Sequence, residues 1–350
     1  MDHAGLPLVF DGHNDVLDQL TRPGGGGVRA FLEGRPDGHL DLPRAGAGGF
    51  GGGLFAVWIP TPEPQRKDRG RIEPAWPPAL DPAYALRRTM TAMATLLRIE
   101  ERSQGQVRIV QTVDELQRPL EPGRIAAVLH LEGADAIDAD LDALHVLHRA
   151  GLRSLGLVWG RPNAFAEGVV AQHGRSPDTG PGLTDAGRRL VRTCNDLRIM
   201  IDVSHLNERG FWDVAALTAA PLVATHSNAY AICPSTRNLT NAQLDAIAAS
   251  DGMVGLNFAA HFVRGDGVRD PATPLTAMLR HVDHLVERIG IDRVGFGSDF
   301  DGTVVSQEIG DVSGLPRLLA ALRARGYDDA ALRKLAHRNW LRVLHATWRA

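Results

Sequence analysis

Short apolar segments alternate with amphipathic segments along the whole chain of 350 residues. Alternation of this kind predicts parallel strands joined by crossover helices, which is the α/β class of fold. About eight strands can be counted by this test, and eight such units favour a closed (β/α)8 barrel, the TIM barrel. The predicted strands are residues 8–10, 54–59, 125–129, 154–158, 200–203, 222–224, 253–257 and 294–297.

Apolar residues at three- and four-residue steps predict helices between these strands. Thr184 is expected to cap one helix, and Thr240 with Gln243 has the spacing of a capping box at the start of another. We expect residues 1–350 to form one barrel domain. The residues expected to pack a further helix onto the barrel are Leu86, Met90, Met93 and Leu97.

The composition argues for a small-molecule substrate. With 38 basic and 41 acidic residues, the formal net charge is -3, so neither nucleic acid nor an anionic membrane is an expected partner. The two cysteines, Cys194 and Cys233, are too few for a disulfide framework. Because neither end carries a signal-like or anchor-like apolar segment, a cytoplasmic protein is expected.

Two long connections interrupt the alternation. One is the proline-rich segment 60–82, and the other is the glycine- and proline-rich segment 161–182. Each follows a predicted strand, so in a (β/α)8 barrel both lie at the carboxyl end of the strands, where active sites are built. Loops of this length are usually functional, and we expect them to form lids or substrate-binding walls.

Residues with metal-binding side chains stand at the ends of several predicted strands. His13 and Asp15 follow the first strand, and strand alternation would point both side chains into the barrel mouth. Glu132 ends another strand, where a carboxylate can either stabilise the following helix or bridge two cations about 3.5 Å apart. His130 shares the strand parity of Glu132 and is expected to be a packed core residue.

His205 and His226 each end a strand, and the two strands are successive. A single histidine in such a place is more often a hydrogen-bonded structural residue, but two with the same placement favour neutral imidazole ligands of a second metal. Imidazole nitrogen and carboxylate oxygen suit zinc, and an open coordination position suits hydrolysis. The residues therefore predict two zinc ions and a barrel of the metallo-dependent hydrolase type.

Asp299 closes the last predicted strand, two residues before the turn signal Asp301-Gly302. Asp301 suits the turn better than Asp299. An aspartate that faces two cations stays ionised, yet it can accept a proton from water and pass it to a leaving amine. We therefore expect Asp299 to be the proton-transfer group.

Six stretches, taken in order, resemble a known family. The chain is similar over nearly its whole length to the membrane (renal) dipeptidases, the zinc dipeptidases of peptidase family M19, and in particular to their soluble bacterial branch. The stretches are residues 11–15 (DGHND), 132–133 (EG), 201–205 (IDVSH), 225–229 (THSNA), 237–238 (RN) and 297–302 (GSDFDG).

The resemblance implies a role for each candidate metal ligand. His13 and Asp15 would bind the first zinc ion, Glu132 would bridge the two ions, and His205 and His226 would bind the second. The implied reaction is hydrolysis of a dipeptide amide bond by a hydroxide that bridges the metals. The two metals would share that hydroxide, and Glu132 would hold the metals together. The resemblance therefore places Glu132 among the catalytic residues.

Substrate contacts follow from the same resemblance. Arg237 would hold the free carboxylate of the dipeptide, because a planar guanidinium offers it two parallel donors. Asp299 would face the substrate and handle the proton. Family members accept dipeptides with a D-residue at the C-terminal position, and some open β-lactam rings, so both substrates are expected candidates.

Trp159 departs from the family pattern, which places a substrate-contacting histidine at this position. An indole N–H can donate a hydrogen bond to a developing oxyanion, but its reach differs from that of imidazole. It can equally form an apolar substrate-binding wall, to which nearby Arg161 would add a charge. The substitution favours, as an alternative, a binuclear zinc hydrolase of another small amide or a lactone.

Two further properties stay open at the level of sequence. Relatives are often dimers, so a homodimer is one expectation, although no interface is legible in the sequence. The fold by itself also permits a metal-free barrel that only binds ligands.

Overall fold

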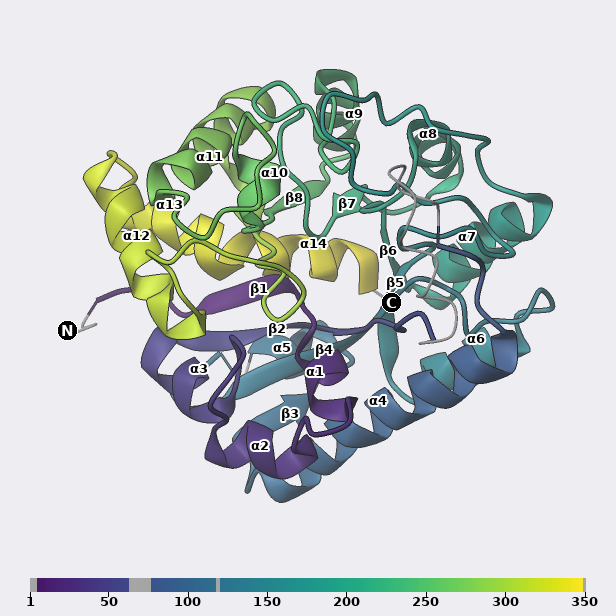
Figure 1. Ribbon diagram of the computed structural model, residues 1–350, viewed down its shortest axis with the longest axis horizontal. Helices are drawn as coiled ribbons and strands as arrows, with labels where there is room; N and C mark the ends of the chain where they lie inside the picture. Colours follow the sequence, from purple (N-terminus) through teal and green to yellow (C-terminus); the bar gives the residue numbers. More distant parts are fainter. Residues whose placement is uncertain (1–4, 63–76, 118–119, 349–350) are drawn as a thin grey trace.

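A closed parallel barrel forms the centre of the protein (Figure 1). The structure, a computed structural model, describes residues 5–62, 77–117 and 120–348. Within these residues nine strands form one sheet, all of whose pairings are parallel. They are β1 (Val9–Asn14), β2 (Phe50–Val57), β3 (Val107–Ile109), β4 (Ile125–Glu132), β5 (Leu152–Gly156), β6 (Met200–Asp202), β7 (Val223–Ala224), β8 (Met253–Leu256) and β9 (Val294–Phe296).

Eight of these strands close the barrel. β2 pairs with β1 on one side and with β4 on the other, so the circuit runs β1-β2-β4-β5-β6-β7-β8-β9 and returns to β1. The predicted (β/α)8 TIM barrel is therefore confirmed, and each of the eight predicted strands overlaps one in this circuit. β3 was not predicted, and it pairs only with the first residues of β4.

Helices surround the barrel and connect its strands (Figure 1). Within the described residues they are α1 (Val16–Thr21), α2 (Gly27–Glu33), α3 (Leu42–Gly48), α4 (Pro82–Arg102), α5 (Val113–Gln117), α6 (Asp142–Arg149), α7 (Asp185–Leu197), α8 (Glu208–Leu217), α9 (Asn241–Ala249), α10 (Ala260–Val263), α11 (Leu275–Ile289), α12 (Leu315–Ala324), α13 (Asp329–Arg333) and α14 (Asn339–Trp348), with the short turns η2 (Ile291–Arg293), η3 (Val312–Gly314) and the π-helical η4 (Lys334–Arg338). Within them, no helix has both the length and the hydropathy needed to cross a bilayer.

The predicted caps are confirmed. The Thr184 side chain accepts a hydrogen bond from the Gly187 backbone at the start of α7, and Thr240 and Gln243 form a reciprocal capping box at the start of α9. These side chains satisfy amide groups that have no partner within the helix, which fixes where each helix begins.

The predicted packing face of α4 is wrong in part. Met93 is buried, but Leu86, Met90 and Leu97 are 39%, 41% and 47% exposed. The face that packs inward combines small and large residues, with Ala85, Ala92, Leu96 and Ile99 buried. Apolar residues occupy more than one face of this helix, so the spacing alone selected the wrong stripe.

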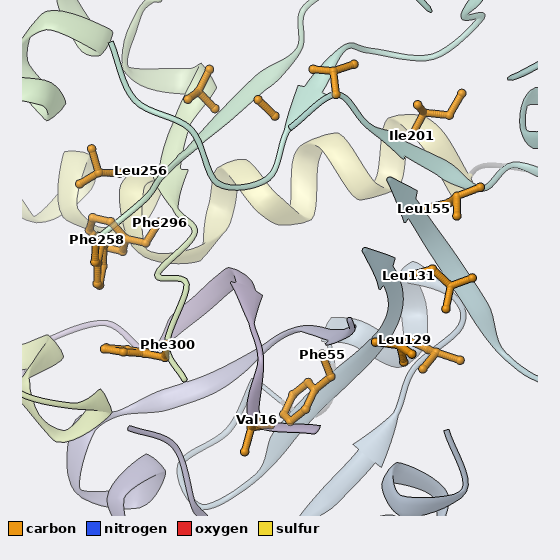
Figure 2. Packing of buried hydrophobic residues seen from close by; sticks show 14 of the residues in the cluster. Val16, Phe55, Leu129, Leu131, Leu155, Ile201, Leu256, Phe258, Phe296 and Phe300 are labelled. Atoms are coloured by element: carbon orange, nitrogen blue, oxygen red, sulfur yellow. The ribbon is translucent and has the colours of Figure 1, made fainter. Parts of the chain in front are cut away.

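The main hydrophobic layer lies between the strands and the helices around them. Figure 2 shows side chains of this layer around the barrel, among them Leu131, Leu155 and Ile201. Because successive residues of a strand point to opposite faces, the alternate residues of the same strands point into the barrel. The interior therefore has its own composition.

A second apolar cluster closes the amino-terminal end of the barrel. Inward-facing residues from the first part of six strands pack there against Trp340 of α14, whose indole Nε1 donates a 2.9 Å hydrogen bond to the Phe296 carbonyl. Gly12 permits this approach, because a Cβ at that position would lie 2.3 Å from the Trp340 ring. We call this cluster the floor of the barrel. Its strand residues are Phe10, Leu54, Ala126, Val128, Met200, Val223 and Met253.

Candidate active site

Polar residues replace the apolar ones towards the carboxyl end of the barrel. On β4, the inward-facing Ala126 and Val128 are followed by His130 and Glu132. His205 and Asp299 follow β6 and β9 with φ angles of 69° and 60°, which non-glycine residues rarely adopt. Backbone strain of this kind clusters at functional sites, where it directs a side chain.

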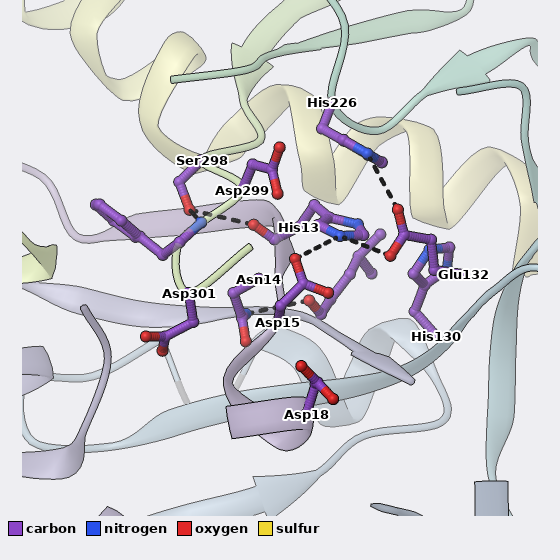
Figure 3. A network of polar contacts seen from close by, with 12 residues as sticks. His13, Asn14, Asp15, Asp18, His130, Glu132, His226, Ser298, Asp299 and Asp301 are labelled. Carbon is purple, nitrogen blue, oxygen red and sulfur yellow. Dashed lines mark hydrogen bonds and ion pairs between the residues drawn. The ribbon is translucent and has the colours of Figure 1, made fainter. Parts of the chain in front are cut away.

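His13 lies between two carboxylates (Figure 3). Its Nε2 is 3.4 Å from Oδ2 of Asp15 and 3.6 Å from Oε2 of Glu132. Asp15 reaches this point differently from the prediction: it lies beyond the end of β1, at the N-cap position of α1, so the turn into the helix directs it and not strand alternation.

Glu132 turns its other carboxylate oxygen towards two further histidines. Its Oε1 lies 2.9 Å from Nε2 of His205 and 3.5 Å from Nε2 of His226. The two imidazole Nε2 atoms are 3.1 Å apart. One carboxylate thus contacts three histidines, with His13 at one oxygen and the other two at the second.

The donor set fits metal ions. Burial lowers the pKa of His205 to about 4 and that of His226 well below its usual value, so both imidazoles are neutral, the form that binds a metal. Burial also opposes a charge on His13, yet Glu132 and Asp15 raise its pKa well above the usual value. Nε2 of His13 has no hydrogen-bond partner among the described residues. The cluster therefore favours positive charge where the ligand atoms meet.

A hydrogen-bond chain behind His226 fixes its tautomer. The Thr225 hydroxyl donates to Oδ2 of Asp202 at 2.5 Å, so it can accept the hydrogen bond from Nδ1 of His226 at 2.8 Å. Burial alone would raise the pKa of the Asp202 carboxyl. The nearby His226 and His130 and the hydrogen bonds from Thr225 outweigh this effect and hold that pKa at about 2. Nδ1 of His226 then carries the proton and Nε2 keeps its lone pair, as a metal ligand requires.

Asp202 and Thr225 were not singled out from the sequence. The available signal was strand alternation: Asp202 precedes Ser204 by two residues, so in a strand both side chains point to the same side. His130, predicted to be a core residue, is fully buried, and its Nδ1 is 2.9 Å from the Ser154 hydroxyl.

Asp299 belongs to the part of the cluster around His13 and Asp15. A carboxylate oxygen of Asp299 and ligand atoms of His13 and Asp15 all lie within 4.8 Å of one another. Nδ2 of Asn257 donates to its Oδ2 at 2.9 Å, and burial raises its pKa. A carboxylate with a raised pKa can carry a proton more readily than a free aspartate.

Asp301 has the structural role that its turn position suggested. Its carboxylate accepts hydrogen bonds from the backbone amides of His39 and Leu40 and from the Arg35 guanidinium. It therefore ties the segment before α3 to the turn that carries Asp299.

A cavity of about 600 Å³ opens over this cluster. Glu132, His205 and Asp299 lie in its wall, and the long connection predicted to form a substrate wall contributes Val169, Val170 and Ala171. Most of the other long connection, residues 63–76, lies outside the described residues, although Pro77 reaches the cavity.

Trp159 and Trp58 form an aromatic part of this wall. Their rings meet edge to face with centroids 5.2 Å apart, and the Trp159 ring is 6.1 Å from that of His205. Arg161 is 1% exposed, and its guanidinium lies over the Trp159 ring at 4.8 Å. Its charge is thus placed behind the tryptophans, and it does not line the cavity as a free cation.

Arg237 lines the cavity from the connection between β7 and α9. It is 4% exposed, and its Nη2 donates to the His226 carbonyl at 3.2 Å. Burial lowers its pKa, and its Nε has no hydrogen-bond partner among the described residues. A buried guanidinium with an unused donor can accommodate an anion.

Known proteins share both the sequence and the fold of this chain. A model of the membrane dipeptidase family, peptidase family M19, matches residues 6–349. The solved structure of the metallopeptidase dipeptidase AC of family M19 is 50% identical, with a TM-score of 0.94 over 99% of this chain and 100% of that chain.

Two further relatives agree with this match. A metallopeptidase from Rhodobacter sphaeroides, solved with a phosphinate mimic of the dipeptide L-Ala-D-Ala, is 50% identical, with a TM-score of 0.93 over 98% of this chain and 100% of that chain. Dipeptidase tcpJ from Claviceps purpurea (strain 20.1) is 28% identical over 97% of this chain and 77% of its own length. The chain therefore belongs to the membrane dipeptidase family, and it is a metallo-dipeptidase of peptidase family M19.

Proposed function

We propose that the metals are two zinc ions and that the substrate is a small dipeptide whose C-terminal residue can have the D configuration. The observation that carries this proposal is the placement of Glu132, whose two oxygens face His13 and the His205–His226 pair respectively. His13, Asp15 and Glu132 would hold one ion, and Glu132, His205 and His226 the other. The imidazole and carboxylate donors suit zinc.

The chain's own residues would position the substrate and move the proton. The chemistry that bound zinc supplies is polarisation of the scissile carbonyl and a lowered pKa for the attacking water. Arg237 would hold the terminal carboxylate of the dipeptide through paired hydrogen bonds. Asp299, with its raised pKa, would accept the proton of the water and donate it to the departing amine.

The D configuration at the C-terminal position is proposed from a relative. The enzyme from Rhodobacter sphaeroides, 50% identical to this chain, was solved with a mimic of L-Ala-D-Ala. Assays of L-Ala-D-Ala beside L-Ala-L-Ala would test this part of the proposal. Hydrolysis of the L,L dipeptide alone would contradict it.

Elemental analysis and a substrate comparison together test the proposed function. We expect about two zinc ions per chain and hydrolysis of free dipeptides by the zinc-loaded protein. C-terminally amidated dipeptides should be cleaved poorly, because they lack the charge that Arg237 would bind. Zinc-loaded protein that cleaves no dipeptide would contradict the proposal.

A second candidate is a zinc hydrolase of another small amide or a lactone. Trp159 favours it, because this indole lines the cavity close to His205 at the position where the family has a substrate-contacting histidine. Lactones and N-acyl amino acids in the same assay would separate the two functions. Faster cleavage of either class than of any dipeptide would favour the second.

A further inference from the structure

We propose that Asp18, on α1, binds a positively charged nitrogen of the substrate's N-terminal residue. This contact would select substrates with a free amine or a cationic side chain. This inference rests on the proposed dipeptide substrate. Asp18 lies on α1, one helical turn after the metal-binding candidate Asp15 (Figure 3). It lines the same cavity as Glu132.

The Asp18 carboxylate is buried but only half satisfied. The residue is 3% exposed, and its Oδ1 has no hydrogen-bond partner among the described residues. A buried carboxylate oxygen without a donor is costly, because it loses the water that would otherwise hydrate it. A donor that enters the cavity with the substrate would satisfy it.

The other oxygen of Asp18 is held in place. Its Oδ2 forms an ion pair with Nη2 of Arg22, the residue that directly follows α1. Nη1 of Arg22 contacts Oε1 of Gln19 at 3.3 Å, and Nε2 of Gln19 donates to the Asp301 carbonyl at 2.8 Å. This chain ties Asp18 to the turn that carries Asp299, so the position of its free oxygen is defined before substrate binds.

The net charge of the metal centre explains why Oδ1 of Asp18 would bind a cation. Two divalent cations would outweigh the carboxylates of Asp15, Glu132 and Asp299, and Arg237 adds another positive charge on the cavity wall. A free dipeptide brings a cation as well as a carboxylate, and its ammonium group is repelled by such a centre. Arg22 balances the charge at Oδ2 of Asp18 and also lines the cavity, so the attraction that remains is the local one of Oδ1, which lacks a partner among the described residues. A donor bound at this oxygen distinguishes the role of Asp18 from that of Arg237.

Three substrates test the proposal in the zinc-loaded full-length enzyme. Alanyl-alanine, in the stereochemistry that is cleaved faster, has only the α-ammonium group; N-propionyl-alanine lacks it; lysyl-alanine adds a cationic side chain. For Asp18→Asn we expect KM for alanyl-alanine to rise roughly tenfold to a hundredfold, the usual effect of a hydrogen bond to a charged group. Hydrolysis of N-propionyl-alanine should change less than about twofold.

The pattern of loss identifies the nitrogen that binds. A loss on both dipeptides assigns the α-ammonium group, and a loss on lysyl-alanine alone assigns the side chain. An equal loss on all three substrates, or unchanged KM values for both dipeptides, overturns the proposal. Wild-type enzyme that cleaves no dipeptide would instead contradict the proposed function, so the two failures are distinguishable.

Two further variants guard the test. Asp135→Asn is the matched control: Asp135 is a partly buried carboxylate with an unpartnered Oδ1, but it does not line the cavity. It should keep wild-type KM values, which excludes a general effect of lost negative charge. If Asp18→Asn does not fold, Asp18→Glu keeps the charge and moves it by one methylene group. A reduced preference for the free amine in that variant supports the site, and an unchanged preference overturns it.

Discussion

The two ends of the barrel satisfy opposite demands with residues from the same strands. At the amino-terminal end, Val128 and its neighbours are fully buried among apolar side chains, and the one polar atom of Trp340 has a hydrogen-bond partner. At the carboxyl end, His13, Asp15 and Asp18 are buried with polar atoms that lack partners among the described residues.

Backbone strain occurs at both ends, since Arg198 and Asp251, just before β6 and β8, also have positive φ angles, but at the carboxyl end it falls on candidate site residues. His205 and Asp299, both at the carboxyl end, adopt positive φ angles that cost conformational energy. The floor offsets such costs by burying a large apolar surface. The comparison indicates that stability is concentrated at the floor and that the unsatisfied groups at the mouth are kept for ligands.

The largest expected effect is on turnover, through the proposed metal-binding residues at the carboxyl end of the barrel, which we call its mouth. Glu132→Gln removes the charge of the carboxylate that faces all three histidines, so we expect turnover to fall by roughly a thousandfold or more. The fold should persist, because the floor is untouched. Activity assays with elemental analysis and circular dichroism measure both effects. Hydrolysis at the wild-type rate would refute the bridging role.

The converse change at the floor should affect stability. Trp340→Ala removes a fully buried side chain that contacts the start of several strands, and we expect the free energy of unfolding to fall by about 3–5 kcal/mol. KM of the remaining folded enzyme should not change. Chemical denaturation and steady-state kinetics test this pair, and a change in KM without loss of stability would contradict the division between the two ends.

The sequence allowed the strands and the candidate ligands to be predicted, because short apolar runs that end in polar residues are local patterns. Glu132, His205 and His226 are examples: Glu132 follows Leu131 directly, and a single hydroxyl residue, Ser204 or Thr225, separates each histidine from the predicted strand before it. β3 was missed because it has only three residues, of which Arg108 is exposed, so no apolar run marks it.

Contacts that depend on packing could not be read from the sequence. Asp18 was not predicted to matter, because an acidic residue in the first turn of a helix is common. Trp58 and Trp159 are far apart in the chain, and only barrel closure brings their rings together. The inward face of α4 likewise depends on which of its apolar stripes meets the barrel.

Arg237→Ala sharpens the account of the mouth. Losing the guanidinium should raise KM for dipeptides with a free C-terminal carboxylate by about a hundredfold, the upper range for a charged hydrogen bond. KM for the amidated dipeptide should change much less, because that substrate lacks the carboxylate. Equal effects on both substrates would exclude Arg237 as the carboxylate-binding group.

The smallest expected effect concerns the residues behind the ligands. Thr225→Val keeps the size of the side chain but removes the hydroxyl that links Asp202 to His226. Since such outer partners orient a ligand and set its tautomer, zinc affinity should fall by about tenfold. Titration with a competing chelator measures this loss. If zinc affinity is unchanged while the fold is intact, the tautomer of His226 is fixed by something other than Thr225.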